Sequence, residues 1–223
     1  TKKNILEDKK SVITQSITLT NQGKMNEAIE LMKDLEKSYP DDIVVKQNLG
    51  MIYYKSGDTD KAIDIYKKAI EINPSEFSSY HNLGLIYEKT KNLKYAKLYY
   101  LKAVSVNPKA EFVLTRLGEI FFSEGNYKKA AQSYDAIIKF QGKEAENAHV
   151  GKALSLSRLG FKIDARSCLE ELKNSKLKSK GSGLLALTYL ETGMIKEGIE
   201  ANRKINGEII FSTTNKQVTI MTD

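Results

Sequence analysis

The chain has 223 residues, of which 41% are hydrophobic and 28% are charged. This balance supports a continuous buried core and argues against a disordered chain. The formal net charge of +7 comes from 35 basic and 28 acidic residues that are largely interspersed, as is typical of solvated helix surfaces. The longest uncharged runs, such as Gly183–Leu190, are too short to cross a bilayer as a helix, so no transmembrane segment is expected.

The first predicted elements are a helix at Ser11–Gln22 and a second helix that follows a turn at Gly23. The second helix carries the small residue Ala28, and Pro40 marks its end, because proline cannot continue a helix. These residues predict a helix–turn–helix unit at the start of the chain.

The next three predicted units share one pattern. The sequence reads KQNLGMIY at residues 46–53, YHNLGLIY at 80–87 and LTRLGEIF at 114–121, so equivalent glycines lie 34 residues apart. An alanine follows twelve residues after each glycine and a tyrosine four residues later. Small residues at two positions allow the two helices of a unit to approach closely. The repeated positions are Gly50, Gly84 and Gly118, then Ala62, Ala96 and Ala130, then Tyr66, Tyr100 and Tyr134, with Pro74 and Pro108 ending the first two copies.

This pattern resembles the tetratricopeptide repeat. The resemblance implies an all-α, right-handed superhelical solenoid in which each unit buries its apolar stripe against its neighbours. The first unit departs from the motif, with Gln15 and Ser16 in place of Leu-Gly, as expected of a terminal repeat. Downstream, Gly160 and Ala165 match a fifth unit, and Gly193 indicates a sixth. We expect about six units in a domain of residues 1–206, near 9–42, 43–76, 77–110, 111–144, 145–178 and 179–206.

Residues 207–223 lie outside the repeat. Glu208–Phe211 and Gln217–Met221 are rich in β-branched residues, with Thr213–Lys216 between them. This predicts either a β-hairpin, a disordered end or the start of a further domain. A lone hairpin is marginal in water and needs a surface to pack on.

The sequence contains few groups suited to catalysis. His81 and His149 are the only histidines, and no glycine-rich phosphate-binding loop is present. The single Cys168 cannot form an internal disulfide, and we expect a packing residue there rather than a nucleophile. We therefore predict no enzyme activity, no metal or cofactor, and no small-molecule substrate.

The resemblance instead implies a concave groove lined by the first helix of each unit. The residues before Leu-Gly are Asn48, Asn82 and Arg116. An asparagine amide both donates and accepts, so it can pair with a peptide unit. The arrangement is similar to the asparagine ladder in the groove of O-GlcNAc transferase, although only two rungs match. Arg116 suits a carboxylate of the bound chain instead. The alternative is that the asparagines are ordinary polar residues of the groove.

Other residues are expected on the same face, and their mixture of apolar and polar groups suits a peptide ligand. The alternative for the apolar ones is burial against the next repeat. The two-carboxylate clamp of chaperone-binding repeats is not expected, because Ile13 and Ile17 occupy its first positions. The other predicted groove residues are Gln47, Met51, His81, Leu85, Phe112 and Glu119.

The sequence therefore predicts a scaffold or adaptor that binds a peptide segment of a partner protein. The alternative is a structural module that self-associates through residues 207–223. Lys173, Lys176, Lys178 and Lys180 form a basic cluster, which is either a solvated linker or a site for an anionic surface. Nucleic-acid binding is not expected, because no aromatic residue accompanies these lysines. The compartment is left open between the cytoplasm and a bacterial periplasm or envelope.

Overall fold

The computed structural model describes residues 2–141, 143–174, 183–206, 210–214 and 217–221. These residues form twelve α-helices and two β-strands. The chain divides into two compact units, Thr1–Pro108 and Lys109–Asp223. The predicted all-α repeat fold is confirmed.

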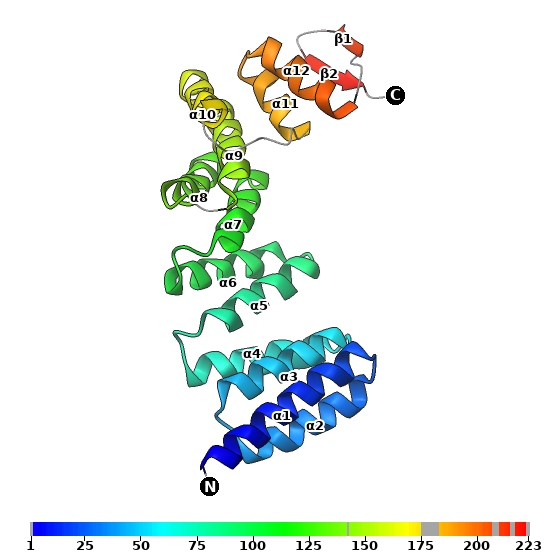
Figure 1. Cartoon of the computed structure of the whole chain (residues 1–223). Helices are drawn as coiled ribbons and strands as arrows, with labels where there is room; N and C mark the ends of the chain where they lie inside the picture. The colour runs from blue at the N-terminus through cyan, green and yellow to red at the C-terminus, as the bar shows by residue number, and fades with distance from the viewer. Residues whose placement is uncertain (1, 142, 175–182, 207–209, 215–216, 222–223) are drawn as a thin grey trace. The chain divides into compact units, whose positions relative to one another are not determined.

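The first unit consists of three helix pairs (Figure 1). Within each pair the helices pack on each other, and α2 packs on α3 and α4 on α5, so the pairs form one stack. This stacking buries the apolar stripe that a single pair would leave exposed. The helices are α1 (Lys2–Asn21), α2 (Met25–Ser38), α3 (Ile43–Lys55), α4 (Thr59–Ile72), α5 (Phe77–Lys89) and α6 (Leu93–Val106).

The tight turns between paired helices need a residue with positive φ. Glycine takes this conformation at Gly57, where φ is +88°, and at Gly125, where φ is +74°. Lys91 occupies the equivalent position between α5 and α6 and has a φ of +60°. A side chain in this left-handed region is strained, so the turn of the third pair is less favourable than those of its neighbours.

The spacing of small and large residues is explained by contacts between paired helices. A Cβ atom added at Gly50 would lie 3.0 Å from Cζ of Tyr66, and one added at Gly84 would overlap the ring of Tyr100. Both tyrosines are almost fully buried, at 2% and 0% exposure. The glycine of one helix is therefore required by the aromatic ring of the other.

The second unit also consists of helix pairs and ends in a β-hairpin. Tyr134 lies between two glycines here, because a Cβ added at either Gly118 or Gly151 would come within 2.6 Å of its Cζ. The sequence reading did not identify Gly151 as a close-contact position. The helices are α7 (Glu111–Ser123), α8 (Tyr127–Lys139), α9 (Ala145–Arg158), α10 (Lys162–Asn174), α11 (Gly183–Glu191) and α12 (Ile195–Asn206).

The hairpin consists of β1 (Ile210–Thr214) and β2 (Gln217–Met221), which pair antiparallel with Ile210 opposite Met221. The prediction placed Thr213 and Thr214 in the turn, and this was wrong, because both lie in β1. Threonine is β-branched, and such residues suit a strand better than a turn.

Candidate functional site

A pocket of about 260 Å³ lies on the first unit, formed by α3, α4 and α5. It contains five of the nine predicted groove residues, from α3 and α5, together with four further residues. None of its lining residues is charged. The predicted residues are Gln47, Asn48, Met51, Asn82 and Leu85, and the others are Tyr54, Tyr66, Ser78 and Ile86.

The pocket's position follows from how α3 and α5 begin. Asp42 caps α3 by accepting a hydrogen bond from the backbone nitrogen of Val45 at 3.1 Å. Glu76, 34 residues later, caps α5 by accepting from the backbone nitrogens of Ser78 and Ser79. A carboxylate at this position satisfies amides that the helix leaves unpaired. Because both helices start at equivalent positions, their equivalent residues line the same pocket.

The two asparagines have different hydrogen bonds within the pocket. Asn48 donates from Nδ2 to the backbone oxygen of Val44 at 2.8 Å, which fixes the orientation of its amide. One N–H and the carbonyl oxygen of Asn48 remain for a ligand. Within the described part of the chain, no hydrogen bond of the Asn82 side chain is found. Asn82 therefore keeps its full donor and acceptor capacity.

Tyr66 adds a third polar group. Its equivalent one repeat later, Tyr100, donates its hydroxyl to Oε2 of Glu88 at 2.6 Å. In the preceding repeat the residue equivalent to Glu88 is Tyr54, which has no carboxylate. The hydroxyl of Tyr66 therefore lacks the acceptor that Glu88 provides for Tyr100. Burial raises the pKa of Tyr66 well above its ordinary value, so its phenol stays protonated and can donate.

His81, although predicted for the groove, does not line this pocket. Its ring stacks on Phe77 with 5.6 Å between the ring centroids. Burial lowers the pKa of His81 below its usual range, so the imidazole is neutral at physiological pH. In this arrangement the histidine is a packing group.

The remaining predicted residues form a separate cluster on α7, in the second unit. Arg116 pairs with Glu119, with 2.7 Å between Nη1 and Oε2. The guanidinium carbon of Arg116 also lies 5.1 Å from the ring centroid of Phe112. All three residues are at least partly exposed, so a peptide carboxylate would have to compete with Glu119 for the arginine.

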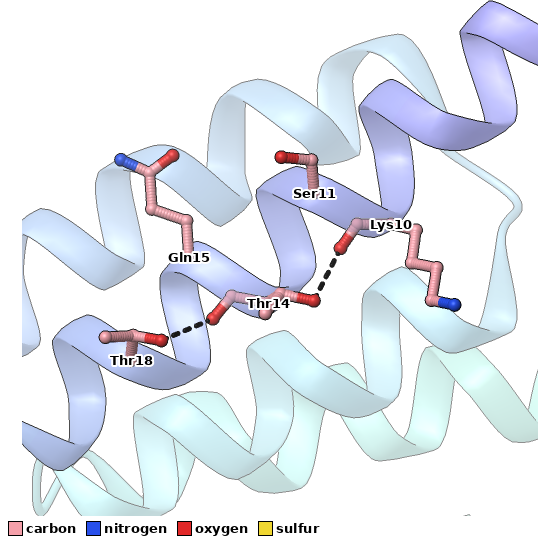
Figure 2. A pocket seen from close by; sticks show the side chains of 5 residues that line it. All are labelled: Lys10, Ser11, Thr14, Gln15 and Thr18. Atoms are coloured by element: carbon pink, nitrogen blue, oxygen red, sulfur yellow. Dashed lines mark hydrogen bonds between the residues drawn. The ribbon is translucent and has the colours of Figure 1, made fainter.

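A larger and more open concave surface, of about 530 Å³, lies on α1. Figure 2 shows that its five lining side chains all come from this one helix, with Thr14 and Thr18 bonded to backbone oxygens one turn earlier. Ser11, Gln15 and Thr18 are equivalent to the buried Val45, Leu49 and Ile52 of α3. The surface is thus the polar outer side of a terminal repeat, and we do not assign a ligand to it.

Cys168 is buried against His149, with Sγ 3.4 Å from Nδ1. Burial raises the pKa of this thiol to about 12, so almost no thiolate exists at neutral pH. Among the described residues no group of side chains could hold a metal ion. In the same part of the chain, no helix has the length and apolar character that a bilayer span requires.

The predicted basic cluster is described only at Lys173, whose Nζ lies 3.6 Å from Oε1 of Glu197. Lys176, Lys178 and Lys180 lie outside the described residues.

Comparison with known families agrees with this fold. A model described as TPR repeat matches residues 50–91, and one described as Tetratricopeptide repeat matches residues 77–109 and 113–143. The chain therefore contains repeats of the tetratricopeptide-repeat family. Proteins of this family are generally non-enzymatic scaffolds, and the repeats support a role in protein interaction. A search of curated proteins found no match.

Several solved tetratricopeptide-repeat structures share the fold. A tetratricopeptide repeat protein from Parabacteroides merdae ATCC 43184 is 19% identical with a TM-score of 0.67, covering 91% of this chain and 80% of that chain. MamA of AMB-1 is 21% identical with a TM-score of 0.60, covering 81% and 97%. YrrB, described as a TPR protein with an unusual peptide-binding site, is 17% identical with a TM-score of 0.61, covering 78% and 89%.

Sequence reading missed part of this tetratricopeptide-repeat pocket. Tyr66 was assigned only to the core, and Ser78 and Ile86 were not singled out. The available signal was the comparison of Tyr54 with Glu88, because only the second of these equivalent positions holds a carboxylate that can accept from the tyrosine of its repeat.

Proposed function

We propose that this protein is a scaffold whose first unit binds an extended peptide segment of a partner protein in the pocket of α3, α4 and α5. The observation that carries the proposal is the gathering of Asn48, Asn82 and Tyr66 at one concave site. The pocket combines apolar walls with a few polar groups, as ligand sites generally do.

The polar groups suit the backbone of a peptide. Asn82 offers a donor and an acceptor, and Asn48 offers an acceptor and one remaining N–H. In an extended peptide the N–H and the carbonyl of one residue point to the same side, so one side-chain amide can pair with both. This recognition is independent of the peptide's side chains, apart from proline, which lacks the N–H.

The apolar and uncharged lining sets the class of peptide. Met51 and Leu85 are half-buried and contribute adaptable apolar surface. No residue lining the pocket is charged, so a charged peptide side chain would be desolvated here without a lining residue of opposite charge, which is costly. The expected ligand is therefore an uncharged segment with one or two apolar side chains, and its binding depends little on salt.

A related fold supports this proposal. YrrB, with a TM-score of 0.61, is described as having an unusual peptide-binding site. We infer the same kind of ligand for this chain, but take the location and the contacts from its own residues. Arg116, in the second unit, is proposed as a separate contact point for a peptide carboxylate that displaces Glu119.

Peptides selected by phage display on the immobilised protein, then synthesised and titrated by fluorescence anisotropy, test the proposal. A selected peptide is expected to lose affinity for the Asn82→Ala variant and to keep its affinity for the matched Asn26→Ala variant. Asn26 is an exposed asparagine on α2, in the same unit and outside the pocket.

The hairpin supports a second candidate, in which β1 or β2 pairs with a strand of a neighbouring molecule. Within the described residues the sheet has two strands, so each strand has one partner. An unpaired strand edge is a template for further pairing. Deletion of residues 207–223 followed by sedimentation analysis tests this, and an unchanged molecular mass would exclude it.

A further inference from the structure

The outer side of α6 differs from that of the other second helices. Leu98 and Leu101 lie on the side of α6 opposite its buried residues Ala96, Tyr100 and Ala103. Both leucines are exposed, at 47% and 45%, although neither position contributes to the core.

Comparison by the spacing of 34 shows how unusual this is. The positions of Leu98 and Leu101 hold Glu30 and Lys33 in α2, Asp64 and Lys67 in α4, and Gln132 and Asp135 in α8. The three equivalent helices thus have polar residues at both places, as solvated surfaces do. Tyr95 extends the apolar stripe, at 45% exposure, where α4 and α8 have lysine.

The charged residues of α6 are all basic. Lys94 lies one turn before Leu98 and Lys102 one turn after it, and α6 contains no acidic residue. No ion pair of Lys94 or Lys102 is found in the described part of the chain. In α4, by contrast, Lys68 pairs with Asp64 at 2.8 Å, so the equivalent surface there is electrically balanced.

We propose that the stripe of Tyr95, Leu98 and Leu101 is a docking surface for the apolar side of an acidic amphipathic helix from a partner protein. Leucines three residues apart lie on one side of α6, so they can pack against the row of apolar side chains on a helix of the partner. Lys94 and Lys102 then face the acidic residues that flank the partner's apolar side.

Charge also argues against a second copy of this chain. Two copies meeting through α6 would bring Lys94 and Lys102 of each into proximity, and such like charges oppose association. A membrane surface is less suitable, because neighbouring residues cover about half of each side chain in the stripe. Insertion into a membrane favours side chains that project further, as Ile163 does at 84% exposure.

The probe is a synthetic stapled helix with leucines along one side and glutamates flanking them, compared with a counterpart in which lysines replace the glutamates. We expect the glutamate-flanked helix to bind the whole protein and the lysine-flanked helix to bind much more weakly. Affinity is measured by fluorescence anisotropy at low and high salt, since an electrostatic contribution weakens with salt.

Two variants test the residues. Leu98→Asp with Leu101→Lys installs the residues that α4 has at these exposed positions, so folding is preserved and binding is expected to fall by about tenfold or more. Lys94→Glu with Lys102→Glu should weaken the glutamate-flanked helix and strengthen the lysine-flanked one. Circular dichroism of both variants checks the fold.

Three results would overturn the proposal. The first is equal binding of both synthetic helices by the wild-type protein, or undiminished binding of the glutamate-flanked helix by the Leu98→Asp, Leu101→Lys variant. The second is no binding of either helix, with binding instead to vesicles of phosphatidylserine and phosphatidylcholine that this variant loses. The third is a concentration-dependent dimer of the wild-type protein that the same variant abolishes. The surface lies apart from the pocket of α3, α4 and α5, so the peptide proposal stands or falls independently.

Discussion

Gly84 of α5 lies directly against the ring of Tyr100 on α6, so that a methyl group added to the glycine would overlap Cδ1 and Cε1. At the equivalent contact, a Cβ on Gly50 would lie 3.0 Å from Cζ of Tyr66. The two repeats therefore have the same residues but different tolerance for alanine. The contact at Gly84 also involves Cδ1 and Cγ of Tyr100, which lie close to the backbone and can move less than the Cζ atom that Gly50 meets.

We expect Gly84→Ala to lower the free energy of unfolding by about 1–2 kcal/mol, since overpacking exceeds the gain in helix propensity. Gly50→Ala is expected to remain within about 1 kcal/mol of wild type, because a small shift of Tyr66 accommodates the methyl group. Urea denaturation monitored by circular dichroism measures both. Equal losses in the two variants would contradict the difference between the contacts.

Lys91 is strained by its φ of +60°. Lys91→Gly is expected to raise the free energy of unfolding by about 0.5–1 kcal/mol, because glycine removes the strain and loses part of that gain to its greater freedom when unfolded. The control is Lys67→Gly, at an exposed position inside α4, which should be destabilised by about 1 kcal/mol. A loss of stability in Lys91→Gly would refute the role of the turn.

Asp42 connects α1 and α3 through Lys9, with 2.5 Å between Oδ2 and Nζ. Burial alone would raise the pKa of Asp42, but the hydrogen bonds from Lys9 and from the backbone of Val45 hold this pKa below its ordinary value. A depressed pKa stabilises the fold above the unfolded-state pKa of about 3.9, and this stabilisation is lost as pH falls through the folded-state pKa.

Asp42→Asn keeps a capping side chain and removes the charge. At neutral pH we expect the variant to be less stable than wild type by about 0.5–1 kcal/mol. The difference should shrink as the pH is lowered from about 5 toward 2. Urea unfolding of both proteins across this range is the measurement, and a difference that does not change with pH would argue against the ion pair.

Cys168 is expected to react very slowly with iodoacetamide at pH 8 in the folded protein, because burial raises its thiol pKa to about 12. Unfolding in urea should restore ordinary reactivity, since the free thiol has a pKa of about 8.5. Mass spectrometry of the alkylated protein follows both reactions. Rapid modification of the folded protein would reveal a reactive thiol in place of a packing residue.

The fold was predictable because its main determinants repeat. Gly50, Gly84 and Gly118 lie 34 residues apart, and each meets a tyrosine of its partner helix. The strain at Lys91 was not predictable, since a lysine in a turn carries no conformational signal of its own. Gly198 lies inside α12, where glycine is generally unfavourable, yet the structure explains it, because a Cβ there would lie 2.7 Å from Cγ of Leu190.

The candidate site was predictable only as a list of residues on one helical side. The repeat spacing of 34 residues predicted that Asn48 and Asn82 line the groove. It did not predict the hydrogen bond from Asn48 to the backbone oxygen of Val44 that fixes the amide of Asn48. Whether the hydroxyl of Tyr66 is available to a ligand depends on which side chain faces it, and this follows only from the three-dimensional structure. The same limit applies to α6, where only the exposure of Leu98 and Leu101 in the folded chain shows that these leucines are not part of the core.

The most direct test of the peptide-binding proposal is the affinity of a display-selected peptide for three proteins: wild type, Asn82→Ala and Asn26→Ala. We expect Asn82→Ala to bind about tenfold more weakly, the equivalent of one or two lost hydrogen bonds, and Asn26→Ala to bind like wild type. Methylation of the contacted peptide nitrogen should weaken binding similarly, since the amide recognises the backbone. Equal affinity for all three proteins would contradict the proposal that this pocket binds the peptide.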